Sequence, residues 1–456
     1  MKNLINKLKF FSSIAIVILV LFACTKEDDK TFDSLTFPNE IHFDKFTETQ
    51  TLQITNSSTK SLMINITLDD YVTNNMGKEQ NRIVESNSTL EMELEFKRNL
   101  ITEEFYSCNI HFYIQALDKE VTIPVSAATI LPEEISLDCD ILDAEYLSDD
   151  DKIITISTVP ENSVRIINPD DGSSASIQLS EKPGYFHVNN ELGKVAVSQL
   201  NQFSVVDLNT KEVKTTPWNV GPYIICLPKE DFLIARQDNG VDIGIDLTDN
   251  TLTFDHYTFI NQMEIHPHNK NRILASGENA YKFNLAAIDY TSGDMIDDYT
   301  TQASENEPEI RGKFWIPKNN KWIFAENMGI YKCSADTNED LKYHSSFTEG
   351  NELNSICYLE KYNIYIAIHR YNPQPWLPDQ NYFVVYDASN LSKTARFPVT
   401  GFPEEMYDEN HKSSEGFFVF TNADESKIYA LVVLGTDLIE GKKWKLLTYD
   451  TNQLFN

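Results

Sequence analysis

The sequence predicts an all-β protein in which a small strand-rich domain precedes a larger ring of repeated sheets. Three observations predict this. A turn pattern recurs through the last two thirds of the chain, paired strand-like runs with small residues precede each copy, and residues 36–127 hold a dense series of strand and turn signals. With 456 residues, of which 41% are hydrophobic, the chain is long enough for two or three domains with cores of their own.

The repeat fixes the larger domain. A short β-rich run followed by a cluster of turn-forming residues returns seven times after about residue 140. The copies begin at Ile167, Val206, Ile245, Ile288, Cys333, Tyr386 and Tyr449, with spacings that grow from about 39 to about 63 residues. A period near 40 to 45 residues with four short strands per unit is typical of β-propellers. Residues 135–456 are therefore predicted to form a seven-bladed β-propeller, with insertions late in the chain.

The end of the chain indicates how this propeller closes. Only six residues follow Tyr449-Asp450, so the seventh sheet is expected to lack its outermost strand. The alternating run from Ile135 to Ile141 is free to fill that place. Pairing the first and last segments would remove an exposed sheet edge. We therefore expect Ile135 to Ile141 to be the outer strand of the final blade.

Residues 36–127 have a different character. Five runs are expected to be strands: Thr51 to Thr55, Ser61 to Leu68, Ser88 to Phe96, Ser107 to Gln115 and Glu120 to Ser126. About 90 residues with strands at this density resemble an immunoglobulin-like β-sandwich. The segment 128–134, which contains Pro132, is the expected linker between the two domains.

The first 35 residues predict export and a lipid anchor. A basic start is followed by an apolar run of about 14 residues, which ends in Leu21-Phe22-Ala23-Cys24 and is too short to span a membrane. This pattern resembles the signal peptide and lipobox of bacterial lipoproteins, with residues 1–23 removed and Cys24 lipidated. Residues 24–35 form an acidic tether, and Lys26 to Lys30 resemble an export tag for the outer leaflet of the outer membrane. The resemblance implies a surface-exposed, lipid-anchored protein, and the periplasmic side stays open as an alternative.

Charge and cysteine content narrow the function classes. The formal net charge of −31 repels phosphate backbones, which argues against nucleic-acid binding and suits cations, basic partners or neutral ligands such as sugars. Five cysteines remain besides Cys24, and their odd number and wide spacing do not predict a disulfide framework. All five are expected to be small buried apolar residues.

Three insertions are expected on one face of blades six and seven. They are residues 370–379, 400–415 and 435–443, and long loops on a rigid scaffold often bind ligands. The candidate ligand-binding residues are Tyr371, Trp376, Phe402, Tyr407, His411 and Trp444. Their aromatic and acidic surroundings suit a carbohydrate or a peptide. The alternative is that Tyr371 and Trp376 only seal the rim against a neighbouring blade.

Signals for catalysis and metal binding are weak. His266-Pro267-His268 could supply metal ligands, but the further ligands are not evident, and the residues are expected to be polar turn residues. Asp149 to Asp151 are expected to form a solvated turn rather than a calcium site. The chain contains no nucleophile elbow, phosphate loop or dinucleotide fingerprint. No catalytic, cofactor-binding or metal-binding residue is therefore assigned.

Taken together, the mature chain resembles a bacterial surface lipoprotein with an immunoglobulin-like domain and a propeller of the YVTN or WD40-like class. The resemblance implies a monomeric, lipid-anchored binding or scaffold protein that captures a glycan or peptide, or docks on an outer-membrane transporter. The alternative is a metal-dependent, lactonase-like propeller hydrolase, which would need carboxylates or histidines to converge at the central channel. A structural subunit of an assembly is a third reading.

Overall fold

The chain is all-β in its computed structural model and divides into two compact units, Met1–Leu131 and Pro132–Asn456. The structure describes residues 34–47, 49–74, 77–97, 105–218, 220–237, 240–257, 259–279, 282–290, 296–300, 310, 312–371, 380–399, 411–436 and 444–455. The division falls inside the segment 128–134, which is the linker expected from the sequence. The expected signal segment, Cys24 and most of the tether lie outside the described residues.

Two sheets build the first unit. One has the order β1-β3-β7-β5, with bounds Leu35–Thr36, Thr49–Asn56, Ser88–Phe96 and Val72–Thr73. The other has the order β2-β9-β8-β4-β6, with bounds Ile41–Phe43, Lys119–Ala128, Phe105–Ile114, Leu62–Thr67 and Glu79–Val84. A short 3-10 helix, η2 (Gln115–Leu117), joins β8 to β9. Strands are found in all five runs expected from the sequence.

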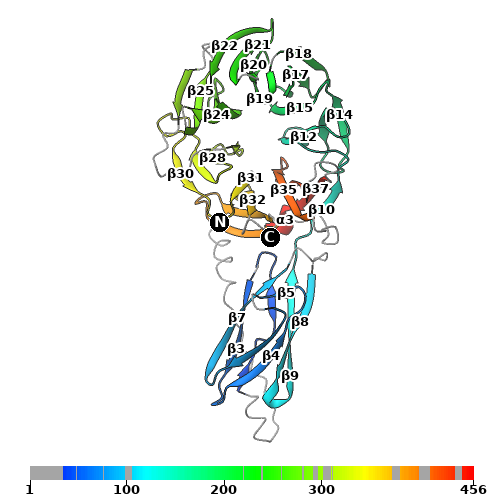
Figure 1. Ribbon diagram of the computed structural model, residues 1–456, viewed down its shortest axis with the longest axis vertical. Coiled ribbons are helices and arrows are strands. Elements are labelled where there is room, and N and C mark those ends of the chain that lie inside the picture. The colour runs from blue at the N-terminus through cyan, green and yellow to red at the C-terminus, as the bar shows by residue number, and fades with distance from the viewer. Residues whose placement is uncertain are drawn as a thin grey trace. The chain divides into compact units, whose positions relative to one another are not determined.

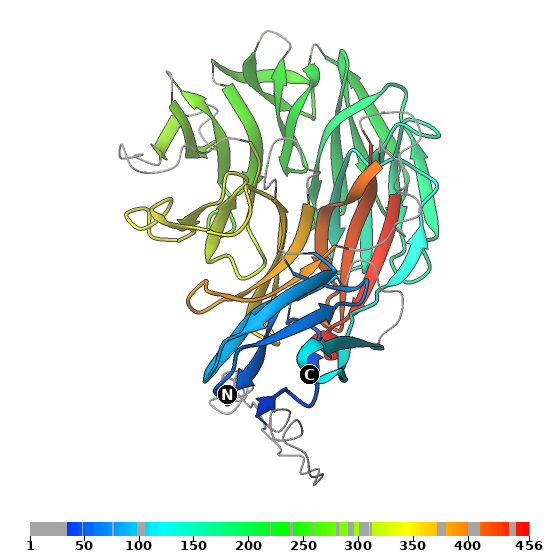
Figure 2. The ribbon, with the colours of Figure 1, turned by 60° about the horizontal axis from the view of Figure 1, so that its bottom comes forward.

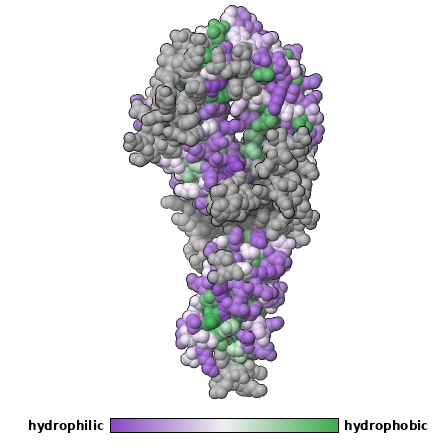
Figure 3. All heavy atoms as spheres, in the orientation of Figure 1, coloured by the Kyte–Doolittle hydropathy of each residue, from purple (hydrophilic) through white to green (hydrophobic). Residues whose placement is uncertain are grey.

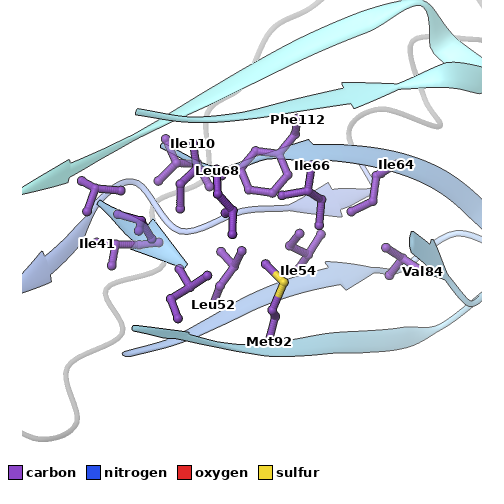
Figure 4. Close-up of a cluster of buried hydrophobic side chains, with 14 of the residues drawn as sticks. Ile41, Leu52, Ile54, Ile64, Ile66, Leu68, Val84, Met92, Ile110 and Phe112 are labelled. Carbon is purple, nitrogen blue, oxygen red and sulfur yellow. The ribbon is translucent and has the colours of Figure 1, made fainter. Parts of the chain in front are cut away.

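The core of this unit lies between the two sheets. Apolar residues alternate along each strand, so every second side chain points to the same side. Figure 4 shows Leu52, Ile54 and Met92 from one sheet facing Ile66 and Phe112 from the other. All five are buried. The unit is therefore two layers of sheet around one hydrophobic core.

In the described part of the second unit, seven four-stranded sheets follow one another, numbered here 1 to 7. Sheet 1 comprises β11 to β14, with bounds Asp143–Leu147, Lys152–Ser157, Ser163–Ile167 and Ser174–Gln178. Sheet 2 comprises β15 to β18, with bounds Pro183–Asn189, Lys194–Gln199, Gln202–Asp207 and Val213–Pro217. Sheet 3 comprises β19 to β22, with bounds Val220–Lys229, Phe232–Gln237, Val241–Asp246 and Thr251–Tyr257.

Sheets 4 to 7 repeat this antiparallel order. Sheet 4 comprises β23 to β26, with bounds Phe259–Ile265, Arg272–Asn279, Lys282–Asp289 and Ile296–Thr300. Sheet 5 comprises β27 to β30, with bounds Phe314–Trp315, Trp322–Ala325, Gly329–Lys332 and Tyr343–Ser346. Sheet 6 comprises β31 to β34, with bounds Glu352–Leu359, Ile364–Tyr371, Gln380–Asp387 and Lys393–Pro398. Sheet 7 comprises β10 (Glu133–Ser136), β35 (His411–Thr421), β36 (Lys427–Thr436) and β37 (Trp444–Asp450), and the helix α3 (Thr451–Phe455) follows it.

The seven sheets pack side by side in a circle. Shared hydrophobic clusters join sheets 1 and 2, 2 and 3, 3 and 4, 4 and 5, and 5 and 6. The ring of Phe383 in sheet 6 contacts Tyr449 in sheet 7, and Phe418 and Tyr429 in sheet 7 share a cluster with Ile153 in sheet 1. Figure 1 shows the resulting ring, with β15, β19, β31 and β35 at its inner side, and Figure 2 shows it from a second direction. The innermost strand is therefore the first strand of sheets 2, 3 and 6, and it is β35 in sheet 7.

Sheet 7 joins the two ends of this unit. β10 pairs antiparallel with β37, and Ile135 lies opposite Leu446. The early segment thus supplies the outer strand of the last sheet, as expected, but the strand spans Glu133–Ser136 instead of Ile135 to Ile141. The shift has a physical cause. Asp140 accepts hydrogen bonds from the amides of Thr158 and Val159, which ties the following residues to sheet 1 instead.

The recurrent turn residues act as expected. Asp207, at the end of β17, accepts hydrogen bonds from the amides of Asn209 and Thr210. Asp246 and Asp387 make the same contact with the residue two positions on. A carboxylate that bonds the local backbone favours a tight turn, so these residues fix the hairpin between the third and fourth strands.

Candidate functional site

The structure describes only part of the residues predicted to bind a ligand. Trp376, Phe402 and Tyr407 lie outside the described residues. Tyr371 is the last residue of β32, and His411 is the first residue of β35. The surface expected from the insertions of blades six and seven therefore remains a prediction.

Trp444 is a core residue. Its side chain is 3% exposed, and its ring lies 5.5 Å from that of Phe417 within the cluster that joins sheets 7 and 1. The large hydrophobic area of tryptophan is buried at this position rather than offered to a ligand. Its inclusion among the ligand-binding residues is therefore corrected.

Titratable side chains from four sheets meet across the ring. We call them the central cluster: Asp143 and Glu145 on β11, His187 on β15, Glu264 on β23, and Lys313 just before β27. Asp143 and Glu145 are two positions apart on one strand, so they point to the same side, while Ala144 between them is buried on the other. Ala144 packs against sheet 7, so the strand period puts both carboxyl groups on the opposite face of sheet 1.

Lys313 and Asp143 form an ion pair across the ring. The Nζ atom of Lys313 lies 3.1 Å from both carboxylate oxygens of Asp143, although sheets 5 and 1 are not neighbours. Burial alone would lower the pKa of Lys313, but the Asp143 carboxylate outweighs this effect, so that the pKa is raised. Lys313 is therefore a cation that pairs with Asp143 next to two further carboxyl groups.

The carboxyl groups of Glu145 and Glu264 hold their protons more strongly than an ordinary glutamate does. Burial is the main cause, and repulsion from neighbouring carboxylates adds to it. The pKa of Glu145 is raised well above its usual value, and that of Glu264 is raised to about 7. The Gln262 side chain donates a 3.0 Å hydrogen bond to Glu264 and opposes part of this rise. The central cluster therefore exchanges protons near neutral pH.

His187 completes the cluster as a neutral donor. Burial lowers its pKa to about 4. Its Nδ1 atom accepts a hydrogen bond from the Leu227 amide at 3.3 Å, which places the ring proton on Nε2. That atom lies 3.9 Å from Oε2 of Glu264. A hydroxyl group that bridges these two atoms could accept a hydrogen bond from Nε2 of His187 and donate one to Oε2 of Glu264.

A cavity of about 590 Å³ opens beside the ion pair of Asp143 and Lys313. Its other lining residues are Leu142, Lys182, Pro183, Gly184, Tyr185 and Leu200. Leu142, Tyr185 and Leu200 are 42%, 39% and 52% exposed, so an apolar and aromatic wall faces solvent beside charged groups. Figure 3 shows mostly hydrophilic atoms, with scattered hydrophobic patches, on the ring face turned to the viewer. We call this cavity the sheet 1–2 pocket.

A second group could hold a metal. His266, Cys333 and Asp340 are buried. Their possible ligand atoms lie within 4.8 Å of one another, and among the described residues this is the group of three or more His, Cys, Asp or Glu side chains that is compact enough to hold a metal ion. His266 lies in the connection between β23 and β24, as expected of a polar turn residue, but its side chain is only 1% exposed.

The remaining predictions can also be located. Asp149 and Asp150 are exposed in the turn between β11 and β12, as expected. In the described part of the chain, no disulfide is present; Cys139, Cys226, Cys333 and Cys357 are buried, and Cys108 is half-buried. None of the described helices has the length and hydropathy needed to span a membrane.

Comparison with known proteins adds no relative. No family model matches the chain, and no curated protein matches it.

Sequence reasoning missed the central cluster, although a signal was present. Acidic residues occupy alternate positions of two first strands, at Asp143 and Glu145 and, with an amide, at Gln262 and Glu264. Alternate polar residues share one face of a sheet, and on an innermost strand that face lies close to the other inner strands of the ring. Tyr185 and Leu200 carried no such signal, because exposed apolar residues are common on protein surfaces.

Proposed function

We propose that this protein is a lipid-anchored binding protein of the bacterial cell surface, in which an immunoglobulin-like spacer carries a seven-bladed β-propeller. The two-layer first unit and the circle of seven sheets support this architecture. The lipobox-like segment ending at Cys24 supports the anchor and the location. The high negative charge argues against a nucleic-acid partner.

The ligand is a glycan held in the sheet 1–2 pocket. The observation that supports this most is the exposed ring of Tyr185 beside the ion pair of Asp143 and Lys313. A flat aromatic surface packs against the apolar face of a sugar ring, while charged groups bond its hydroxyls. A volume of about 590 Å³ is within the range of small-molecule sites and fits a short oligosaccharide. The ligand is therefore assigned to sheets 1 and 2 rather than to the insertions of blades six and seven.

A glycan array tests this proposal. We expect the purified protein to bind a defined subset of immobilised oligosaccharides, and Tyr185→Ala to weaken that binding more than tenfold. Tyr113→Ala is the matched control, because Tyr113 is 38% exposed and lies in the first unit. Equal binding by Tyr185→Ala and the wild type would reject the site, and the absence of binding to any glycan would reject the ligand class.

The hydrolase alternative has one observation in its favour. Glu264, with a pKa of about 7, lies within electrostatic reach of Asp143, which pairs with Lys313. Carboxyl groups whose pKa values are driven apart can divide the roles of acid and base. A metal-dependent hydrolase has less support. The compact group of possible metal ligands among the described residues, His266, Cys333 and Asp340, lies outside the central cluster. Product formation from an array-bound glycan or a lactone, lost in Glu264→Gln while binding persists, would favour this alternative.

A further inference from the structure

His266, Cys333 and Asp340 meet where sheets 4 and 5 adjoin. His266 follows the last residue of β23, Cys333 follows the last residue of β29, and Asp340 lies before β30. They are 1%, 5% and 5% exposed. Asp143, which lines the sheet 1–2 pocket, is the first residue of β11, so the pocket lies where the first strand of sheet 1 begins. His266 follows the last residue of β23, so it lies beyond the end of the first strand of sheet 4. This cluster is therefore separate from the proposed glycan site.

The backbone holds all three residues in place. The amide of His266 donates to the carbonyl of Arg272, and the amide of Cys333 donates to the carbonyl of Lys321. The amide of Asp340 donates to the carbonyl of Asp336. Side chains on backbone fixed in this way can hold an ion without much loss of conformational freedom.

Hydrogen bonds already orient two of the three side chains. The Ser334 amide donates to Oδ1 of Asp340 at 2.7 Å, which leaves Oδ2 directed at Nε2 of His266, 3.0 Å away. The His268 amide donates to Nδ1 of His266 at 3.1 Å, so the ring proton lies on Nε2 in the metal-free protein. A backbone bond to one oxygen of a ligating carboxylate is the usual support of a metal site.

We propose that His266, Cys333 and Asp340 bind one Zn²⁺ ion that links sheet 4 to sheet 5. Zinc accepts thiolate, imidazole and carboxylate ligands together, whereas calcium and magnesium require oxygen ligands. Zinc bonds of about 2.0–2.3 Å place the ligand atoms of a tetrahedral site roughly 3.2–3.8 Å apart. The ligand atoms of His266, Cys333 and Asp340 are up to 4.8 Å apart, so the longest separation must shorten by about 1 Å when zinc binds. Water fills the fourth position.

Binding rearranges the protons of the cluster in a balanced way. Cys333 loses its thiol proton to solvent when the zinc–sulfur bond forms. The ring proton of His266 moves from Nε2, which takes the metal, to Nδ1. The hydrogen bond from the His268 amide is then broken, and this loss opposes zinc binding.

The local structure explains why a link is useful there. Sheet 5 has the shortest strands of the seven described sheets, with two residues in β27 and four in each of β28, β29 and β30. Few ladder hydrogen bonds hold such strands, so this sector opens most easily unless its side chains are tied together. A metal bound only by the folded state stabilises that state.

Zinc content and thermal stability test the proposal. Chelator-treated full-length protein is mixed with excess Zn²⁺, freed of unbound metal and measured by elemental mass spectrometry. We expect one zinc per chain and a higher melting temperature than that of the metal-free form. Cys333→Ser is expected to lose both the zinc and the shift. Cys357→Ser, which replaces a buried cysteine in sheet 6, is the matched control and should keep them.

A second variant and a second metal guard against misfolding. If Cys333→Ser does not fold, Asp340→Asn keeps the side-chain shape and should still lose zinc. Replacing Zn²⁺ by Co²⁺ should produce a thiolate-to-cobalt absorption band in the wild type and in Cys357→Ser. No stoichiometric zinc in the wild type, or zinc and the cobalt band retained without Cys333, would overturn the proposal and leave the glycan site unaffected.

Discussion

Replacing Ile135 by aspartate is expected to lower the free energy of unfolding of the second unit by about 3 kcal/mol. Ile135 lies in β10 and packs against the cluster that joins sheets 7 and 1. Its Cγ2 atom lies so close to Gly172 that a Cβ atom there would be 2.3 Å away. A carboxylate would lose these apolar contacts and remain partly buried beside apolar side chains. The strand that closes the ring would then detach.

Chemical denaturation followed by circular dichroism measures this loss. Ser136→Asp is the matched control, because Ser136 is the next residue of β10 and is exposed. It should change the free energy of unfolding little. Equal stability of Ile135→Asp and the wild type would mean that β10 does not contribute to holding the ring closed.

Replacing Glu264 by glutamine is expected to stabilise the protein at pH 8 by on the order of 2 kcal/mol and to flatten its stability profile. Burial and neighbouring carboxylates raise the pKa of Glu264 from 4.5 to about 7 on folding. The folded chain therefore binds this proton more tightly than the unfolded chain does. The resulting stability is complete below pH 4.5 and is lost as the pH rises through about 7. Glutamine stays neutral and can still accept the bond from Gln262.

Urea midpoints between pH 4 and pH 9 test this expectation. The wild type should lose stability across the interval from about 4.5 to about 7, and Glu264→Gln should show a much shallower slope. Glu93→Gln, at an exposed position of β7 in the first unit, controls for the loss of one negative charge. If stability falls with pH equally in the wild type and in Glu264→Gln, the Glu264 carboxyl group ionises as readily in the folded state as in the unfolded state.

The sequence predicts the repeated architecture because local chemistry repeats with it. Each turn carries an aspartate or a similar residue, and Asp207 shows why: its carboxylate bonds the next backbone amides wherever it occurs. These turns follow the third strand of a sheet, as Asp207 does at the end of β17 and Asp387 at the end of β33. β6 (Glu79–Val84) was missed because its buried positions include a polar residue, Gln80, which breaks the expected alternation.

The candidate site is less predictable because it depends on contacts across the ring. Lys313 and Asp143 are 170 residues apart, and no local pattern joins them. The same holds for His266 and Asp340, which meet 74 residues apart. Trp444 illustrates the opposite error, since its position beside a long insertion suggested exposure, whereas packing against Phe417 buries it. Sequence periodicity predicts on which face of a sheet a side chain lies. Which side chains from distant sheets contact it depends on how the sheets pack in the ring.

The central cluster exists only if the circle closes, and a disulfide between β10 and β37 tests this closure most directly. Ser136 and Lys445 are opposite residues of the antiparallel pair, where Cα atoms lie roughly 4.5–5.5 Å apart, within the range that a disulfide spans. The double variant Ser136→Cys with Lys445→Cys should form this bond under mild oxidation, as detected by peptide mass spectrometry. Ser136→Cys with Thr448→Cys, which is out of register, should not. A cross-link that forms equally in both variants, or in neither, would contradict the closed ring.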